Sequence, residues 1–326
     1  MKISTIGKVS IILAITFVVS LVLCILTGPA MLIPGGFESE TIYQHEQTSL
    51  LGINNLDVSV PDADVNIYPI DGKEVNITLT GTYAKNEYGG NVNLSVKKVG
   101  ETLEIKVIYP NINFVVINRD FNLYIGVPKN YSGDISVFSA SGNINVKDLE
   151  TTEFKVNTAS GEIKISNINN SGNSLIRSSS GNIDINNINS ENINIRSISG
   201  EIICDYIKIN EEFYSETSSG DIKVRNLENS GSNFKSISGE VTLINLEEIN
   251  SIATSSGNII IEDYLVKNEL NIKSVSGEVE LDLIEDSSID LKFESVSGDL
   301  DNNFGDVYGG NNKIFVKTTS GDLRIY

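Results

Sequence analysis

Residues 197–224 read SISGEIICDYIKINEEFYSETSSGDIKV and hold two copies of the pattern that decides the fold. Each copy is a Ser-Gly dipeptide followed by Asn, Asp or Glu and then by an aliphatic residue. Ten copies recur at spacings of 18 to 23 residues, with the glycine at positions 142, 161, 181, 200, 220, 239, 257, 277, 298 and 321. A short repeat of this kind is typical of a solenoid, in which every repeat forms one coil.

Aligning the copies on the glycine predicts two strands in each repeat. Aliphatic residues stand two and four positions after the glycine, as in Ile183 and Ile185, with a polar residue such as Asp184 between them. A second strand precedes the glycine, where aliphatic Ile195 is followed by Arg196. Alternation with period two is typical of half-buried strands. A third aliphatic column lies seven residues after the glycine, at Leu149, Ile168, Ile188, Ile207, Leu227, Leu246 and Ile284.

One repeat buries too few aliphatic side chains to offset the conformational entropy that it loses, about 1–2 kcal/mol per residue. Stacked repeats share a continuous core, so the strands are expected to pair between successive repeats. The predicted fold is all-β, a β-solenoid of about ten coils of ~20 residues, with a rise of about 4.8 Å per coil. All six prolines lie outside the repeats, as expected for strands that are paired on both sides.

The Ser-Gly dipeptide is interpreted as a corner of the coil. The glycine is expected to need a positive φ or a close backbone approach. The serine directly before it, and the Ser or Thr two residues before that serine, are expected to face inward as a ladder of hydroxyls. These hydroxyls are predicted to satisfy backbone groups of the turn rather than to carry chemistry.

Residues 41–130 lack the repeat but alternate as strands, for example in Leu56–Val60 and Val75–Leu79. They are predicted to form a β-rich cap region before the solenoid domain, residues 131–326. Whether the cap is a separate sandwich or a set of irregular early coils is left open by the sequence.

The N-terminus holds 18 uncharged residues, 9–26, after Lys2 and Lys8. A run of this length is near the lower limit for crossing a bilayer. We expect a cytoplasmic segment at 1–8, one transmembrane helix (a signal anchor) at 9–28 and a linker at 29–40, with the rest of the chain outside the cell membrane. A cleaved signal, a lipid on Cys24 and a buried core helix are the alternatives.

Composition narrows the function further. The net charge is -19, and setting Lys2 and Lys8 aside leaves -21 for the remainder, which argues against nucleic-acid binding. One His, two Cys and no Trp argue against disulfide frameworks, His-rich metal sites and Ser-His catalysis. We therefore assign no catalytic, cofactor-binding or metal-binding residue and no cofactor. His45 is expected to be a surface residue, and Cys204 a buried small hydrophobe.

Two columns beside the glycines are candidate surfaces. The position after the glycine is acidic in seven of ten copies: Asn143, Glu162, Asn182, Glu201, Asp221, Glu240, Asn258, Glu278, Asp299 and Asp322. It is interpreted as a solvated turn position, with a divalent-cation or cationic-ligand strip as the alternative. The position two before the glycine should face outward, yet it holds Ile198, Ile237, Val275 and Val296, a candidate protein-contact strip.

An enzyme that cleaves polysaccharide is the main catalytic alternative, because glycoside hydrolysis needs two carboxylates. Asp299 with Asp301, or Asp184 with Glu162, are the pairs that the sequence offers. No repeat departs from the pattern by a long loop that would build a cleft, so a non-enzyme is favoured. Self-association is a further expectation, because Asp322–Tyr326 ends the chain on a strand whose edge would be open.

The apolar N-terminal run, residues 124–128 (YIGVP), residues 132–135 (SGDI) and the serial S-x-S-G-[NED]-[IV] repeats resemble the "putative adhesin" family of bacterial cell-envelope proteins. LiaG-like proteins belong to that family. The resemblance implies a membrane-anchored or surface β-solenoid, linked in some members to envelope stress, in a domain of unknown function. It implies no catalytic residue. The partners expected are the membrane, through one helix, and an envelope protein or polysaccharide.

Overall fold

A computed structural model of the chain describes residues 38–85, 91–109, 117–285 and 287–326. The predicted cytoplasmic segment 1–8, the transmembrane helix 9–28 and most of the linker 29–40 lie outside these residues. Within the described ranges the secondary structure is strand and turn, and no helix there is long and apolar enough to cross a membrane. Residues 39–326 form one compact unit.

Two large sheets make up this unit. Sheet A has fourteen strands in the spatial order β1 (Glu38–Ser49), β4 (Glu74–Lys85), β7 (Ile117–Pro128), β3 (Asp64–Ile70), β9 (Ile144–Thr151), β11 (Ile163–Asn170), β13 (Ile183–Ser190), β15 (Ile202–Ile209), β17 (Ile222–Glu228), β19 (Val241–Leu246), β21 (Ile259–Tyr264), β23 (Val279–Leu283), β27 (Leu323–Ile325) and β25 (Leu300–Asn302). Sheet B has thirteen strands in the spatial order β24 (Ile289–Glu294), β26 (Asn312–Lys317), β22 (Leu270–Lys273), β20 (Ser251–Ala253), β18 (Ser232–Lys235), β16 (Phe213–Glu216), β14 (Asn192–Arg196), β12 (Asn173–Ser178), β10 (Phe154–Thr158), β8 (Asp134–Ser139), β2 (Asn55–Val60), β6 (Thr102–Ile108) and β5 (Asn93–Val99).

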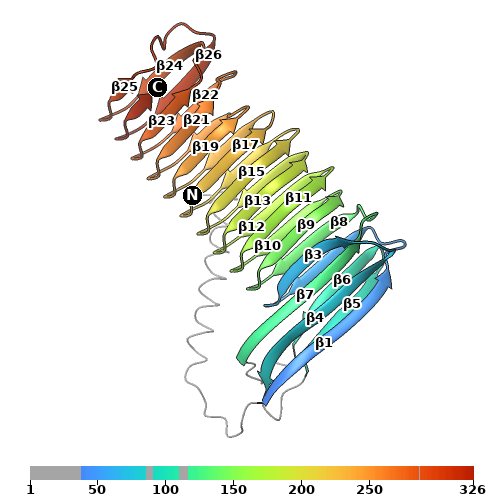
Figure 1. Ribbon diagram of the computed structural model, residues 1–326. Helices are drawn as coiled ribbons and strands as arrows, with labels where there is room; N and C mark the ends of the chain where they lie inside the picture. The colour runs from blue at the N-terminus through green and yellow to red at the C-terminus, as the bar shows by residue number, and fades with distance from the viewer. Residues whose placement is uncertain (1–37, 86–90, 110–116, 286) are drawn as a thin grey trace, which may run out of the picture. The chain divides into compact units, whose positions relative to one another are not determined.

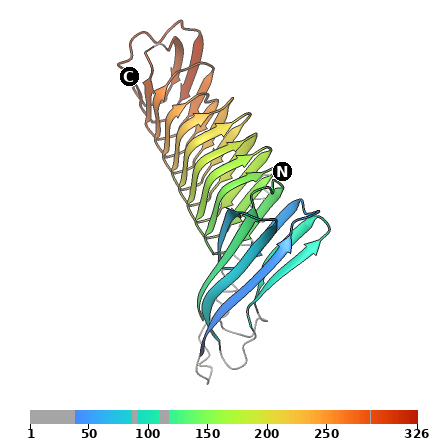
Figure 2. The same ribbon diagram turned by 45° about the vertical axis from the view of Figure 1, so that its right-hand side comes forward.

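Each coil of the solenoid contributes one strand to each sheet. A strand of sheet B leads into a Ser-Gly corner, and a strand of sheet A follows, as in β14 and β15. Strands of neighbouring coils pair in parallel, as Figure 1 and Figure 2 show from two directions. The predicted all-β solenoid of about ten coils is confirmed, with two strands per coil.

The core consists of the predicted aliphatic columns, stacked in register. Ile183 lies opposite Ile163 on one side and Ile202 on the other, and all three are fully buried. Identical side chains at one position of successive coils therefore pack as a continuous column, which supplies the burial that a single repeat lacks. The prediction for Ile284 is wrong: the register shifts in that coil, Leu283 pairs with Tyr264, and Ile284 is 44% exposed.

The cap region continues the same two sheets. β3 pairs in parallel with β7 and β9, and β2 pairs in parallel with β6 and β8. β4 then pairs antiparallel with β7, and β1 lies beyond it as the edge strand of sheet A. β5 pairs antiparallel with β6 and is the edge strand of sheet B; β4 and β5 appear in blue-green in Figure 1. Gln44 of β1 bridges the sheets, because its amide donates to the Val92 carbonyl (3.1 Å) and accepts from the Leu94 amide nitrogen (2.5 Å). The region thus forms early coils with an antiparallel end.

The other end of the solenoid departs from chain order. β26 and β27, the last strands of the chain, lie between the coil of β22 and β23 and the coil of β24 and β25. The expectation that Asp322–Tyr326 presents an open edge is therefore wrong, because Leu323 and Ile325 are fully buried between paired strands. The edge of sheet A is β25, whose three residues are all exposed.

Candidate functional site

The Ser-Gly corners stack so tightly that only glycine fits. A β-carbon on Gly161 would overlap the carbonyl oxygen of Gly142, and the same overlap recurs in successive coils up to Gly277. The close approach predicted for these glycines is confirmed. A positive φ is not, since none of the ten repeat glycines has one.

The hydroxyl three residues before the glycine organises the corner. Thr217 Oγ1 accepts a hydrogen bond from the Gly220 amide nitrogen at 3.1 Å, and Ser197 Oγ accepts one from Gly200 at 2.9 Å. Thr254 Oγ1 instead donates to the Gly257 carbonyl at 2.8 Å. The prediction that the inward hydroxyls satisfy the turn backbone is confirmed in these coils, whereas the equivalent Ser178 Oγ is buried without a hydrogen-bond partner.

The serine directly before each glycine behaves differently from the prediction. All ten of these serines are exposed and none shares the inward phase. The corner turns between the two serines of the motif, so the backbone no longer alternates with period two there. We call the surface formed by these serines, with the residues on either side of each Ser-Gly dipeptide, the corner edge.

The column after the glycine is built from hydrogen bonds between coils. Asn182 Oδ1 accepts the amide nitrogen of Glu201 at 3.0 Å, and Asp221 Oδ1 accepts that of Glu240 at 2.8 Å. The short side chain of one coil therefore caps the backbone of the next. These hydrogen bonds to the backbone explain why Asn or Asp stands after the glycine in alternate coils, and the explanation needs no bound cation.

The glutamates of this column are partly neutralised by basic side chains. Glu201 pairs with Lys223 at 2.8 Å, and Glu278 pairs with Arg324 at 2.8 Å. Within the described ranges no group of three or more His, Cys, Asp or Glu side chains is arranged to hold a metal ion. The structure thus explains the column by backbone capping and ion pairs, which reduce the like-charge repulsion along it.

A two-coil period runs along the corner edge, and the sequence analysis missed it. Motifs of the form SISGE or SVSGE alternate with motifs such as TSSGD and TSSGN from residue 197 to residue 278. Three of the four coils with Glu after the glycine therefore carry Ile or Val at the outward position, and the fourth carries Ala159. The backbone follows the same period: the Ile198 carbonyl accepts both Ser218 and Ser219 amide nitrogens, and the Ile237 carbonyl accepts both Ser255 and Ser256. Aligning every second repeat would have revealed this signal.

The outward column forms an exposed aliphatic strip, as predicted. Ile198 and Ile237 are each 48% exposed, Val275 is 51% exposed and Val296 is 83% exposed. Serines or threonines occupy the intervening coils. Aliphatic side chains therefore recur about every 10 Å along the strip, since strands are spaced by about 4.8 Å.

The remaining sequence candidates do not come together as one site. His45 is exposed on β1, with Nδ1 2.9 Å from Thr78 Oγ1, and Cys204 is buried with a free thiol whose pKa burial raises. Glu162 forms an ion pair with Lys164 at 3.2 Å, and Lys164 lies opposite Asp184 on the neighbouring strand. Asp299 and Asp301 are both exposed on the outermost coil. None of these four carboxylates lines the clefts described below.

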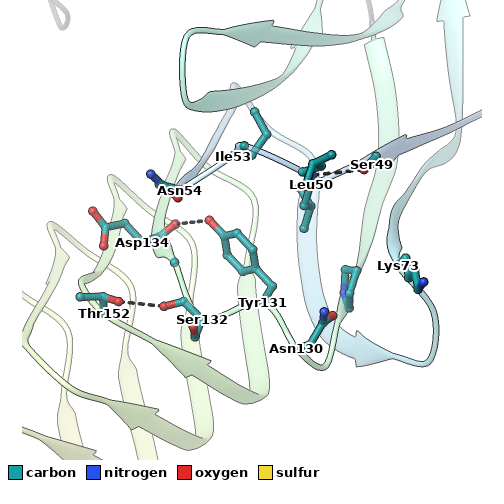
Figure 3. Close-up of a pocket in the computed structure, with 14 residues that line it drawn as sticks. Ser49, Leu50, Ile53, Asn54, Lys73, Asn130, Tyr131, Ser132, Asp134 and Thr152 are labelled. Atoms are coloured by element: carbon teal, nitrogen blue, oxygen red, sulfur yellow. Dashed lines mark hydrogen bonds between the residues drawn. The ribbon is translucent and has the colours of Figure 1, made fainter.

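A cleft of about 780 Å³ lies where the cap region meets the first coils. Its walls are the loop between β1 and β2 and the loop between β7 and β8, with Lys73 and Thr152 at its margins (Figure 3). Tyr131 stands between the walls and donates to the Asp134 carbonyl at 3.1 Å. The Asp134 carboxylate is occupied too, because it accepts the Glu153 amide nitrogen at 3.1 Å. No sequence pattern had marked this cleft.

The lining of the cleft mixes polar and apolar residues and holds few titratable side chains. Burial and the neighbouring Asp134 raise the pKa of the Tyr131 hydroxyl, so this phenol stays protonated and is a poor base. Lys73 and Asp134 are the other titratable side chains of the lining, which contains no His or Cys.

The geometry defines a class: a two-sheet β-solenoid with a serine-rich corner edge and an antiparallel cap. The sequence profile described as Toastrack DUF4097 matches residues 53–245 and again residues 173–326. The chain belongs to this family. The two overlapping matches reflect the internal repeat, and the finer likeness to LiaG-like members stays a prediction.

Several solved structures are similar to the chain. A putative adhesin from Parabacteroides distasonis is 12% identical, covering 90% of this chain and 98% of its own, with a TM-score of 0.43. One from Bacteroides fragilis is 12% identical, with coverages of 88% and 97% and a TM-score of 0.39. A putative lipid binding protein from P. distasonis is 14% identical, with coverages of 89% and 98% and a TM-score of 0.44. No curated protein matches.

Proposed function

We propose that this protein is a non-enzymatic, membrane-anchored β-solenoid outside the cytoplasm, and that its corner edge binds another protein of the cell envelope. One observation carries the proposal: Ile198, Ile237 and Val275 are half-exposed at every second coil, at positions where the intervening coils carry Ser or Thr. Serine suffices for folding at this corner, so the aliphatic side chains are not needed for the coil itself. Regularly spaced exposed aliphatics favour an interaction surface.

The chemistry of the edge limits the partner. Each exposed aliphatic stands three residues before a glutamate or aspartate, as Ile237 does before Glu240. A complementary surface therefore needs apolar side chains in line with Lys or Arg. The strip from Ile198 to Val296 spans several coils, long enough for an interface of ordinary size, about 800 Å² per partner.

A second copy of this chain suits the edge poorly. Two corner edges in contact would oppose two acidic columns, and the whole chain carries a net charge of -19. Like charges across an interface disfavour association. We therefore assign the edge to a different, basic and apolar protein surface.

The membrane anchor rests on the sequence. Residues 9–26 are uncharged and follow Lys2 and Lys8, which favours a helix with its N-terminus in the cytoplasm. In cells, the full chain should stay with the membrane fraction after alkaline extraction, and added protease should digest residues 39–326 in spheroplasts. Release into the soluble fraction would contradict the anchor.

Photo-crosslinking in the native cells tests the partner site. A photoreactive residue placed at 237 or 275 of the full chain should yield one adduct of defined mass. The same residue at 155, on the exposed side of β10, serves as the matched control and should yield none. Ile198→Lys should abolish the adduct formed from 237. An equal yield from 155, or an adduct with the mass of two copies of the chain, would overturn the proposal.

A further inference from the structure

A second corner of the coil repeats with an unusual backbone conformation. Six residues after the repeat glycine the backbone has φ between 52° and 60°, at Asp148, Asn167, Asn187, Tyr206, Asn226, Asn245 and Asp263. Asn and Asp tolerate this left-handed region better than other residues with side chains. Tyr206 is the exception among the seven, and a bulky residue there is strained.

Tyr206 also interrupts a ladder of side-chain amides. Asn187 Nδ2 donates to Asn167 Oδ1 at 2.8 Å, and Asn245 Nδ2 donates to Asn226 Oδ1 at 2.8 Å. The tyrosine at the coil between them has no amide to continue the ladder. Among the described residues, none donates to the Oδ1 of Asn187, so this oxygen of an exposed side chain can accept from a ligand.

The neighbouring residue compensates for part of the loss. Asp205 Oδ1 accepts the Asn226 Nδ2 amide at 2.8 Å and also the backbone nitrogen of Tyr206 at 3.0 Å. Asp205 thus takes the place of the missing amide. A strained residue that breaks a stabilising ladder and needs such a substitute suggests a role other than folding.

The tyrosine ring is presented to solvent beside a polar hollow. Its side chain is 61% exposed, the highest exposure at any aromatic residue within the described repeats before residue 300. The adjoining depression, of about 540 Å³, is lined by Asn187, Tyr206, Ile207, Lys208, Asn226, Leu227, Glu228, Asn245 and Glu247. Ile207 and Leu227 are buried in the core, so the accessible wall consists of one aromatic ring, amides and charged groups.

This combination matches the chemistry of a sugar. The C–H groups of a pyranose face stack on the electron-rich face of an aromatic ring, while its hydroxyls need donors and acceptors at the sides. Asn187 supplies a vacant acceptor and Asn245 a side-chain amide. Lys208 and Glu228, paired at 2.8 Å, supply a donor and an acceptor at the rim. An apolar protein surface would leave these groups unpaired.

Charge selects the kind of glycan. Glu228 and Glu247 outnumber Lys208 in the lining, and the chain as a whole is acidic. A glycan rich in carboxylates or sulfates would be repelled. We propose that Tyr206 is the stacking platform of a binding site for an uncharged glycan chain, with Asn187, Lys208 and Glu228 as hydrogen-bonding neighbours. The site is separate from the corner edge and does not depend on the proposed function.

Replacing Tyr206 by asparagine, the residue at the equivalent position of both adjoining coils, separates a role in folding from a role in glycan binding. Tyr206→Asn restores the amide ladder and removes the ring, so the melting temperature should rise while glycan binding falls at least tenfold. Tyr206→Phe keeps the ring and should bind within about twofold of the original chain, since stacking needs the face and not the hydroxyl. Tyr308→Asn, which removes another exposed tyrosine, is the matched control and should bind normally.

The measurement is calorimetric titration of the full chain, in detergent, with cellohexaose, chitohexaose and mannohexaose, and with polygalacturonate as the charged comparison. At least one neutral hexasaccharide should bind and polygalacturonate should not. Overturning results are the absence of binding by all three neutral probes, tighter binding of polygalacturonate, or unchanged affinity in Tyr206→Asn. A lower melting temperature in Tyr206→Asn would show that the tyrosine serves the fold.

Discussion

The carbonyl oxygen of Gly181 occupies the place that a β-carbon on Gly200 would take. The two glycines belong to successive coils, so their contact sets how closely the coils stack at the corner. Gly200→Ala should force the two coils apart and lower the free energy of unfolding by about 1–3 kcal/mol, as overpacking does. Urea unfolding followed by circular dichroism measures this, with Ser199→Ala as the exposed control at less than about 0.5 kcal/mol. Equal stability of the two variants would contradict the tight corner.

The order of the last coils is testable with one pair of substitutions. Ile325 is fully buried in β27, between β23 and β25, whereas Leu300 is on the edge strand β25 and 36% exposed. Ile325→Asp should cost more than about 3 kcal/mol, because it buries a charge without a partner. Leu300→Asp should cost less than about 1 kcal/mol at an exposed edge. If the coils followed chain order, the ranking of the two melting temperatures would be reversed.

The exposed strip should tolerate charge without unfolding. In the double variant Ile198→Lys and Ile237→Lys both ammonium groups reach solvent, so the urea midpoint should change little. Ile195→Lys, three residues from the first site but fully buried, should lose more than about 3 kcal/mol. Loss of β-type circular dichroism in the double variant would show that the strip belongs to the core.

Glu216 should titrate below the ordinary range of a glutamate. Partial burial opposes its ionisation, but the hydrogen bonds from Lys235 (2.6 Å) and Tyr214 (3.0 Å) outweigh it and lower the pKa. Because the pKa of Glu216 is lower in the folded than in the unfolded chain, its ionised form stabilises the fold at any pH above the ordinary pKa of a glutamate. This contribution is lost as the pH falls through the lowered pKa of the folded state. NMR titration of the carboxyl groups should show a higher pKa for Glu216 in Lys235→Met than in the original chain. In the control Lys155→Met the pKa of Glu216 should not change. An unchanged value in Lys235→Met would rule out this network.

Alkaline pH should unfold the protein partly through Tyr264. Burial, with a smaller contribution from Glu248, raises the pKa of this phenol to about 12, and its oxygen accepts the Ile249 amide nitrogen at 3.2 Å. The unfolded chain ionises first, so stability falls between pH ~10 and pH ~12 by about 1.4 kcal/mol per unit for each such group. Tyr264→Phe should be less stable by about 1–3 kcal/mol at neutral pH, because it leaves a buried amide unpaired. Its deficit should narrow as pH rises; a deficit that widens would contradict the raised pKa.

The regular part of the molecule was predictable from residues such as Ile183 and Asp184. Every coil must present the same face to the coils on either side, so a period-two pattern repeated in register specifies the buried side chains directly. The exposure of the strip at Ile198 and Ile237 was predicted from the same period-two alternation of the strand before the corner. The inward hydroxyls, exemplified by Thr217, followed because a corner needs partners for its amide groups.

The errors occurred where the backbone leaves the strand geometry. The serines before the glycines were assigned inward by extending the alternation through a corner, where it no longer applies. Ile284 was misplaced because one coil shifts its register. Tyr206 attracted no notice, since its conformation is visible only when its φ is compared with those of Asn187 and Asn226.

The sequence by itself determined the coil, its two strands, its buried columns and its glycine corner, because all of these are local features multiplied by repetition. Only the tertiary structure decided the order of the ends, with β27 between β23 and β25 and the cap strands added to the same sheets. Those choices depend on which sheet edge a strand joins, and the period-two pattern that marks Ile325 as buried does not say which neighbouring strands bury it. The strained tyrosine beside its hollow likewise exists only once neighbouring coils are stacked.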